Sequence, residues 1–338
     1  MNKKIFILLL LSAIVLFITS CDSTKPQNTF SENWIAVANI DGTDLQYLCR
    51  GNETTYFVPD LENPEQELLM LDCYTHVDLM NLDGSDRRTI IDSVGSIYRF
   101  SADRTKMLLN RDGEIYIANT DGTEFKNLTG TPDQYEGDPA FSIFEDAVIF
   151  KSSDIADSIS YIASIDLVSL QRKVIFFEHY DGYMYYVSPV FINESTVIFG
   201  QYYSDILNTN GLYSVNINTG YKKLIDVGYT FSKMIYNRNE NLFAYIISDE
   251  FTVLKHYNPM TDKVFEYARC DNRLIPNFNR DGTLLAVNLN VYDTETIEMY
   301  NILKNYFDEA NSTDRTIDFN VSSEKAVMRL SRIFPNSI

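Results

Sequence analysis

The stretch "EIYIANTDGTEFKNLTGTPDQYEGDPAFS", residues 114–142, decides the fold because it holds a tight-turn phrase, Asn-x-Asp-Gly-Thr, from Asn119. Nearly the same phrase occurs as "NIDGTD" from Asn39 and as "NLDGSD" from Asn81, so the turn recurs about every forty residues. Asp and Gly accept a positive φ at little cost, and an Asp-Gly pair between alternating segments is a strong hairpin signal. The chain therefore repeats one hairpin at a nearly fixed period.

Weaker copies of this hairpin continue along the chain, around residues 167–169, 218–220, 259–262 and 293–296. Between successive hairpins lies a second unit, an apolar strand, a polar turn and another strand, as in "PAFSIFEDAVIFK" from Pro139. The two units supply four short strands per repeat, which is typical of a propeller blade. We predict an all-β chain, a β-propeller of seven four-stranded blades, or six if the weak hairpin at 290–302 is not a blade edge.

The two ends of the repeat array indicate how the ring closes. The first recognisable unit, residues 34–49, is an outer hairpin, and the last, residues 317–332, is an inner one. A ring must close to leave no open sheet edge. We therefore predict one composite blade with two strands from each terminus.

The repeat phrases resemble the WD40-like (PD40) repeats of TolB-type β-propellers. In that family the phrase runs Ile-Tyr-x-x-Asn-x-Asp-Gly, then Leu-Thr, then Asp-Pro-x-Trp-Ser-Pro-Asp-Gly. The resemblance is close over residues 76–142 and loose after residue 160; Phe141 stands where the family has Trp, and only Asp281-Gly282 keeps the second Asp-Gly. The resemblance implies a propeller fold and a scaffold role in envelope assemblies, but no segment matches a TolB partner-binding segment.

The N-terminus has the parts of a secretory signal peptide: Lys3 and Lys4, an apolar run from Ile5 to Ile18, then small residues. The fourteen residues of this run span about 21 Å, which is short of the ~30 Å hydrocarbon core of a membrane. The end of the run, Ile-Thr-Ser-Cys, resembles the bacterial lipobox, which implies cleavage before Cys21 and lipidation of that residue.

We accordingly divide the chain into a lipoprotein signal peptide (1–20), a polar tether with lipidated Cys21 (21–33) and a single propeller domain (34–338). Several acyl chains would hold the protein on a membrane outside the cytoplasm. We expect the bacterial cell envelope, with the outer membrane or cell surface favoured; Asp22 resembles an inner-membrane retention signal, which leaves the inner membrane as the alternative.

The net charge and the number of cysteines argue against a nucleic-acid partner and against a framework of disulfide bonds. The net charge of −19 becomes −21 when Lys3 and Lys4 leave with the signal peptide, and this charge repels nucleic acid, so we predict no nucleic-acid partner. Beyond Cys21 the chain has three cysteines, an odd number that suits a disulfide framework poorly. One pair is an alternative, but we expect buried or free thiols at Cys49, Cys73 and Cys270.

Catalytic and metal-binding patterns are weak. The Asn-x-Asp-Gly turns lack the later bidentate Glu of an EF-hand, so we expect their Asp and Asn side chains to bond their own turns. The three histidines, His76, His179 and His256, occupy non-equivalent places in their repeats, and we expect structural or surface roles for them. The chain has no Gly-x-Ser-x-Gly elbow. We predict no catalytic residue, no metal and no cofactor, with a paired-carboxylate glycosidase left open.

The most informative local feature is a group of tyrosines in "EHYDGYMYYVSP" (178–189) and "GQYYSDILNTNG" (200–211). The first segment connects one blade to the next, and the second loop joins that next blade's second and third strands, so both emerge on one face of the ring. Such a cluster suits protein or sugar recognition. Packing between blades is the alternative. The predicted rim comprises His179, Tyr180, Tyr183, Tyr185, Tyr186, Tyr202 and Tyr203.

These features together predict a membrane-anchored, extracytoplasmic propeller lipoprotein that is not an enzyme and that binds an envelope protein or a glycan. The rival hypothesis is a glycan lyase or hydrolase with its site at the channel mouth. An enzyme should bring His, Arg or carboxylate groups together at the channel, whereas a binding module should present a broad aromatic rim.

Overall fold

The structure is a computed structural model, and it describes residues 30–39, 46–50, 53–154, 159–178, 184–203, 209–228, 231–237, 242–248, 252–270, 276–278, 284–287, 290–293, 299–301, 319–321 and 325–334. Every regular element in these ranges is a β-strand. Within the same ranges no helix has the length and apolar character to cross a membrane. The predicted signal peptide, the predicted lipidation site Cys21 and most of the predicted tether lie outside the described residues.

The described strands form seven four-stranded sheets with antiparallel neighbours, and six of these sheets use four consecutive strands. The first three are built from β3 (Thr54–Pro59), β4 (Glu67–Asp72), β5 (His76–Asn81) and β6 (Arg88–Asp92); β7 (Ile97–Phe100), β8 (Lys106–Arg111), β9 (Glu114–Asn119) and β10 (Lys126–Asn127); and β11 (Gln134–Phe141), β12 (Ala147–Asp154), β13 (Ser160–Asp166) and β14 (Arg172–Phe176).

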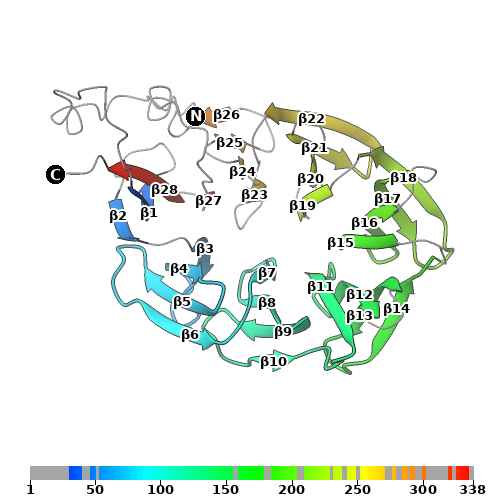
Figure 1. The fold of residues 1–338 in the computed structure, drawn as a ribbon, viewed down its shortest axis with the longest axis horizontal. Helices are drawn as coiled ribbons and strands as arrows, with labels where there is room; N and C mark the ends of the chain where they lie inside the picture. Colours follow the sequence, from blue (N-terminus) through cyan, green and yellow to red (C-terminus); the bar gives the residue numbers. More distant parts are fainter. Residues whose placement is uncertain are drawn as a thin grey trace.

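The next three are built from β15 (Met184–Asn193), β16 (Thr196–Tyr203), β17 (Gly211–Asn216) and β18 (Lys222–Val227); β19 (Phe231–Asn237), β20 (Leu242–Ser248), β21 (Thr252–Asn258) and β22 (Lys263–Cys270); and β23 (Pro276–Phe278), β24 (Leu284–Val287), β25 (Asn290–Asp293) and β26 (Met299–Asn301). The sheets stand around a ring with the first strand of each innermost (Figure 1). The predicted all-β propeller with four-stranded blades is confirmed, and the weak hairpin at 290–302 contributes β25 and β26.

The remaining sheet is the predicted composite blade, in the order β2-β1-β28-β27. It joins β1 (Phe30–Asn39) and β2 (Gln46–Arg50) to β27 (Phe319–Val321) and β28 (Lys325–Phe334), which Figure 1 shows side by side in blue and red. β1 pairs with β28 without a break from Phe30↔Phe334 to Asn39↔Lys325. Because β28 offers ten residues of ladder, β1 begins at Phe30, inside the segment 21–33 that we had assigned to the tether.

The core lies between neighbouring sheets. The second strand of a blade is apolar along its length, as in Leu68–Leu71 and Val197–Phe199, because both of its faces pack against other sheets. One buried cluster spans the sheets that begin at β11, β15 and β19; another joins the β3–β6 sheet to the β7–β10 sheet. A third joins the composite sheet to the β3–β6 sheet, with Ile35 and Val37 against Leu69 and Leu71.

The Asp-Gly turns are held by their own side chains. In the turn after β9, Asp121 Oδ1 accepts bonds from the Thr123 backbone N–H at 2.8 Å and from its hydroxyl at 2.6 Å. In the turn after β5, Asp83 Oδ1 accepts the same two bonds from Ser85, at 2.9 Å and 2.6 Å. These two turns confirm the turn interpretation of the repeated phrase.

Candidate functional site

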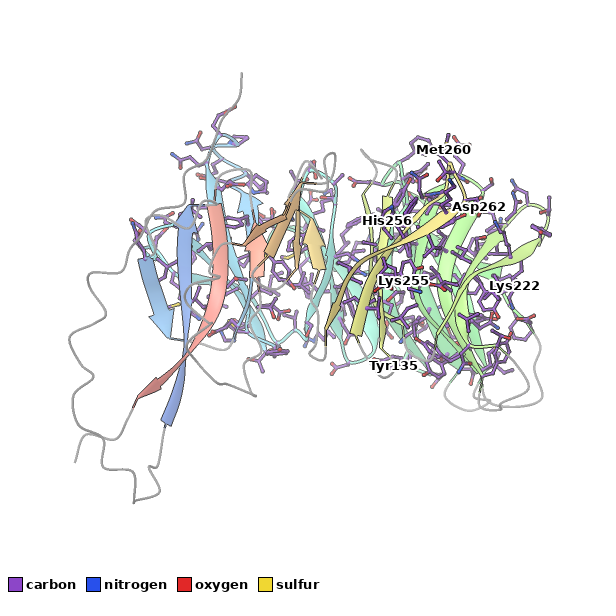
Figure 2. The ribbon with its side chains drawn as sticks, turned by 90° about the horizontal axis from the view of Figure 1, so that it is seen from above. Tyr135, Lys222, Lys255, His256, Met260 and Asp262 are labelled. Carbon is purple, nitrogen blue, oxygen red and sulfur yellow. The ribbon has the colours of Figure 1, made fainter. Side chains whose placement is uncertain are left out.

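One face of the ring collects the starts of the innermost strands, and we call it the entry face. The connection from β14 to β15 and the loop from β16 to β17 emerge there, because strands in each blade alternate in direction. Figure 2 shows the ring from its side, with Tyr135 of β11 at the entry face on the lower edge and Met260, in the β21–β22 turn, at the opposite edge.

Two tyrosines occupy equivalent places at the entry face. Tyr135 is the second residue of β11 and Tyr185 the second residue of β15, and each strand then continues to a shared Pro-x-Phe phrase. Their exposed fractions are 48% and 37%. Tyr185 stacks on its cross-strand neighbour Tyr202, with ring centroids 4.8 Å apart. We define these three tyrosines and the exposed Phe177 as the aromatic rim.

The structure describes some of the predicted rim residues, and it places these partly at the surface and partly in the core. His179, Tyr180 and Tyr183 lie outside the described residues. Tyr186 is fully buried, with its ring 5.4 Å from that of Phe199, so its assignment to a recognition surface is corrected: it fills the space between blades. The reason is the two-residue period of a strand: successive side chains point to opposite faces of the sheet, so Tyr185 reaches solvent while Tyr186 packs in the core.

Tyr203 belongs to a half-buried polar network around Glu178. The Glu178 carboxylate accepts bonds from Lys222 Nζ at 2.5 Å, from Gln201 Nε2 at 2.8 Å and from the Tyr203 hydroxyl at 3.3 Å. Burial opposes ionisation of Glu178, but the bonds from Lys222 and Gln201 hold its pKa below the usual range. Because Glu178 follows β14 and Lys222 begins β18, the network ties two consecutive blades together.

Bulges in the innermost strands bring polar groups toward the ring axis. The β11 register shifts between Gly137 and Ala140, and Asp138 there has a φ of 50°. The β15 register shifts at the equivalent place, and Ser188 has a φ of 46°. Asp138 Oδ2 accepts a bond from the Ser188 N–H at 3.2 Å and lies 3.1 Å from Lys151 Nζ.

Arg99 crosses from β7 to a sheet that is not its neighbour. Its Nη2 donates to the Met234 carbonyl of β19 at 2.6 Å, and its Nη1 donates to the Tyr98 carbonyl at 2.9 Å. Burial lowers the pKa of Arg99, although the Asp138 charge opposes that effect. We call Tyr98, Arg99, Asp138 and Lys151 the axial cluster.

The rim and the axial cluster are in contact. The side chains of Tyr98 and Tyr135 share a hydrogen bond, and burial together with Tyr135 and Asp138 raises the pKa of Tyr98. The axial cluster has one carboxylate among its members, whereas glycoside hydrolysis uses two. Among the described histidines, His76 lies at the start of β5 and His256 stacks on Phe265, so neither joins the axial cluster.

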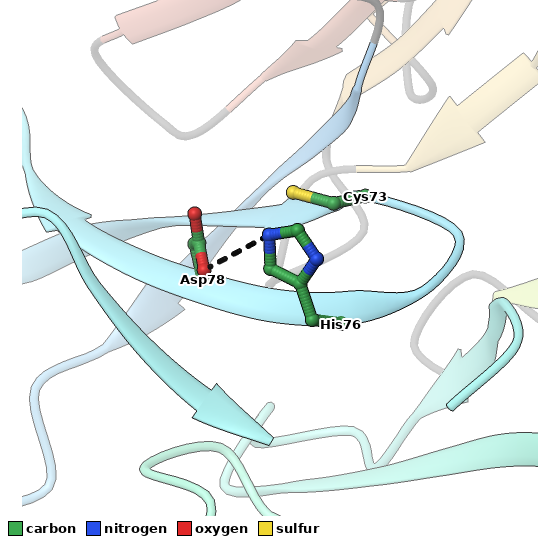
Figure 3. Close-up of side chains that lie close together, drawn as sticks. All are labelled: Cys73, His76 and Asp78. Carbon is green, nitrogen blue, oxygen red and sulfur yellow. Dashed lines mark ion pairs between the residues drawn. The ribbon is translucent and has the colours of Figure 1, made fainter. Parts of the chain in front are cut away.

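A second group of reactive side chains lies on the β4–β5 hairpin. One ligand atom each from Cys73, His76 and Asp78 falls within 4.8 Å of the other two (Figure 3). Cys49 and Cys73 are both free thiols. Burial, followed by the Asp78 and Glu53 charges, raises the pKa of Cys73 to about 11. Burial also raises the pKa of Cys49.

Sequence reasoning missed several of these residues. Tyr135 could have been found by aligning the Pro139-x-Phe141 phrase with Pro189-x-Phe191, since the tyrosine precedes each proline by the same interval. The phrase "CYTHVD" from Cys73 is also a usable signal, because a tight hairpin places its Cys, His and Asp on one side. Nothing local marks Arg99, whose bonded partner is 135 residues away.

No family model matches the chain, and no curated protein matches it. Solved structures do match: oligogalacturonate lyase from Vibrio parahaemolyticus has a TM-score of 0.58 at 12% identity, over 82% of this chain and 86% of that one. TolB from Acinetobacter baumannii has a TM-score of 0.50 at 15% identity, over 82% of this chain and 63% of that one. The chain has a TolB-like β-propeller fold.

A second oligogalacturonate lyase structure, solved in complex with manganese, has a TM-score of 0.56 at 9% identity and covers 82% of this chain and 96% of that one. At these identities the likeness extends to the TolB-like propeller fold alone.

Proposed function

We propose that this TolB-like propeller is a membrane-anchored extracytoplasmic lipoprotein that binds a protein or glycan partner through its aromatic rim and catalyses no reaction. The observation that carries the proposal is the pair Tyr135 and Tyr185, exposed at equivalent places of neighbouring blades. Tyr185 is backed by its stack on Tyr202. Both tyrosine side chains are therefore available to a partner at the entry face, and the Tyr185 ring has a second ring behind it.

Tyrosine suits this role for physical reasons. Its ring supplies a large rigid contact area at low conformational-entropy cost, and its hydroxyl can bond a polar partner. The axial cluster next to Tyr135 adds charged and polar groups that can orient a bound glycan or peptide. Exposed apolar side chains with a few polar neighbours are the usual composition of a recognition site.

The anchor and the location are part of the same proposal. Cleavage before Cys21 and lipidation of that residue would tether the ring to a membrane of the bacterial envelope, facing away from the cytoplasm. The outer membrane or cell surface is favoured, and the inner membrane is the alternative. The TolB resemblance also suggests that the protein acts as a scaffold in an envelope assembly, and we include this role in the proposal.

A second function, glycan lyase or hydrolase, is favoured by one observation, the convergence of Arg99, Asp138 and Lys151 toward the axis. A lyase or hydrolase would use Asp138 as an acid or base. Asp138 is held by Lys151 and the Ser188 N–H, so its carboxylate is engaged in the structure's own contacts. We therefore favour binding without catalysis.

The rim is tested by comparing the wild-type chain, a Tyr135→Ser/Tyr185→Ser variant and a matched Phe144→Ser/Tyr221→Ser control on an oligosaccharide array and against detergent-solubilised envelope proteins. Phe144 and Tyr221 are exposed too, but they lie in the β11–β12 and β17–β18 turns, at the face opposite the entry face. The proposal expects one ligand class that wild type and control bind and the rim variant does not. Equal binding by all three would overturn the rim as the recognition surface.

The other two parts of the proposal have their own tests. Radiolabelled palmitate should enter the wild-type chain and not a Cys21→Ala variant; labelling of both would refute lipidation at Cys21. Incubation with acidic and neutral oligosaccharides should give no new reducing ends and no unsaturated products. Product formation that disappears in Asp138→Asn would replace the binding function with the enzymatic one.

A further inference from the structure

The β4–β5 hairpin gathers three side chains of metal-binding type on one side of a sheet. The Cys73 N–H donates to the His76 carbonyl at 3.0 Å, which closes the hairpin, and Tyr74 in the turn has a φ of 63°. Cys73 and His76 therefore face each other across the hairpin. Asp78 follows His76 by two residues, and the two-residue period of a strand places it on the same side.

The three donor atoms are of the kinds that zinc uses: a sulfur, an imidazole nitrogen and a carboxylate oxygen. All three lie within 4.8 Å of one another, and His76 Nε2 is 3.5 Å from Asp78 Oδ1. In Figure 3 the sulfur and the imidazole ring both lie on the Asp78 side of the hairpin. Small rotations of the half-buried Cys73 and His76 side chains would bring these atoms to the separation of ligands around one cation.

Neighbouring groups hold the two donors of β5 in position. Thr75 Oγ1 is 3.0 Å from His76 Nδ1, which leaves Nε2 facing Asp78. Arg87 Nε donates to Asp78 Oδ2 and Thr89 Oγ1 donates to Asp78 Oδ1, both at 2.7 Å, and these two bonds fix the carboxylate with Oδ1 on the side of the histidine. Metal-binding histidines and carboxylates are commonly oriented by such second hydrogen bonds.

The charges around the hairpin also fit a divalent cation. Arg87 Nη2 lies 3.4 Å from Glu53 Oε1, and Glu53 Oε2 is buried with no hydrogen-bond partner in the part of the chain that the structure describes. Asp78 and Glu53 carry two negative charges against the single positive charge of Arg87, which leaves one net negative charge beside Cys73 and His76. A divalent cation that displaces the proton of the Cys73 thiol would make the group neutral.

We propose that Cys73 Sγ, His76 Nε2 and Asp78 Oδ1 bind a divalent cation of the zinc class, with water as the fourth ligand. The His76 side chain is 35% exposed, which gives the ion a route from solvent. The site lies beside the apolar joint between the composite sheet and the β3–β6 sheet, to which both Cys49 and Cys73 contribute. Bound metal would thus stabilise the place where the ring closes.

The site is tested with Co²⁺, whose absorption reports thiolate coordination, titrated into the metal-free mature chain and then displaced by Zn²⁺. The wild type should develop a thiolate-to-cobalt band and visible bands of a tetrahedral site. Cys73→Ser should lose the thiolate band. His76→Gln, which replaces an exposed ligand and leaves the core intact, should weaken Co²⁺ binding by about 10- to 100-fold.

The matched control is Cys49→Ser/Cys270→Ser, which leaves Cys73 as the only cysteine beyond Cys21. Cys49 Sγ is 3.6 Å from Arg87 Nη1, so it shares the neighbourhood without being one of the three ligands. The control should keep the full band and raise its unfolding temperature on adding Zn²⁺ as the wild type does. Absence of the band in wild type, or its loss in the control, would overturn the assignment.

Discussion

Gly122 shows at the scale of one residue why the repeated turn needs glycine. Its φ is 89°, and a Cβ added there would lie 2.5 Å from the Ile90 carbonyl oxygen and 2.9 Å from the Ile90 Cβ. Gly220, in the equivalent turn of a later blade, has a φ of 70° and no heavy atom within 4 Å of such a Cβ. Gly122 is needed both for its left-handed backbone and because the neighbouring blade leaves no room for a side chain. Gly220 is needed for its left-handed backbone alone.

We expect Gly220→Ala to lower the free energy of unfolding by about 1 kcal/mol, which is the cost of a left-handed backbone for alanine. Gly122→Ala should cost at least ~3 kcal/mol because overpacking adds to that term. Urea unfolding followed by far-UV circular dichroism measures both, provided that the slopes with urea agree. Equal losses in the two variants would contradict a close contact between Gly122 and Ile90.

Glu178 gives a pH-dependent prediction. Its folded pKa lies below the unfolded one, so its contribution to stability is complete above about pH 4.3 and is lost as the pH falls through the folded value. Glu178→Gln should destabilise the protein at pH 7 by less than about 1 kcal/mol, because the side chain is 40% exposed and screened by solvent.

The difference between wild type and Glu178→Gln should begin to shrink below about pH 4.3 and approach zero as the pH falls through the lower folded pKa, where wild-type Glu178 itself takes up a proton. Urea midpoints across this range give the measurement. In a Lys222→Met background the same substitution should show little pH dependence. A difference that stays constant down to pH 3 would show that Glu178 is not held ionised by its neighbours.

At the scale of elements, consecutive blades are joined by polar bridges as well as by apolar packing. Asp226 of β18 accepts a bond from Lys255 Nζ of β21 at 2.9 Å and from the buried Tyr245 hydroxyl of β20 at 2.7 Å. The Asp226 and Lys255 side chains are 18% and 23% exposed. Water screens such a half-buried pair only partly, so the pair should stabilise the contact between the two sheets.

A double-mutant cycle of Asp226→Ala and Lys255→Met should give a coupling energy of about 1–2 kcal/mol in unfolding experiments. Lys106 and Glu124 form the matched control, since they are 3.5 Å apart and far more exposed, at 43% and 72%. Their coupling should stay below about 0.5 kcal/mol. Similar coupling in both cycles would mean that burial between blades does not strengthen the Asp226 bridge.

Sequence patterns predicted elements best where the period of a strand is clear. The turn phrases at Asn81 and Asn119 and the apolar runs of the second strands lead directly to the β5–β6 and β9–β10 turns and to buried β4 and β16. The bulges at Asp138 and Ser188 were not predicted. They depend on a positive φ before proline, which spacing alone does not reveal.

At the scale of the whole molecule, stability depends on the composite sheet. Deleting residues 317–338 removes β27 and β28 and leaves β1 without the partner it has along its full length. We expect this variant to unfold without a sharp transition and to self-associate, because unpaired edges template further pairing. Size-exclusion chromatography with light scattering and thermal unfolding check both outcomes.

A shorter deletion of residues 336–338 is the control, because β28 ends at Phe334 and its ladder stays whole. This control should remain monodisperse to the same extent as the full chain, with an unchanged unfolding temperature. If the long deletion were to unfold like the control, closure by the two termini would not be what holds the ring together.

The candidate site was predicted in part. The sequence placed Tyr185 and Tyr202 at one face, where the structure stacks them, but it grouped Tyr186 with them although that ring packs inside. It missed Tyr135 and the axial cluster, because Asp138 and Arg99 acquire their roles from neighbouring and distant blades.

By itself the sequence determined the strands, the turns, the four-strand repeat and the pairing of the two termini, because these follow from local backbone preferences and from the alternation of apolar residues. Only the tertiary structure decided which side chains meet, such as Tyr135 with Tyr98 and Asp226 with Tyr245. Those contacts form between separate sheets, and their partners are set by how the blades pack around the ring.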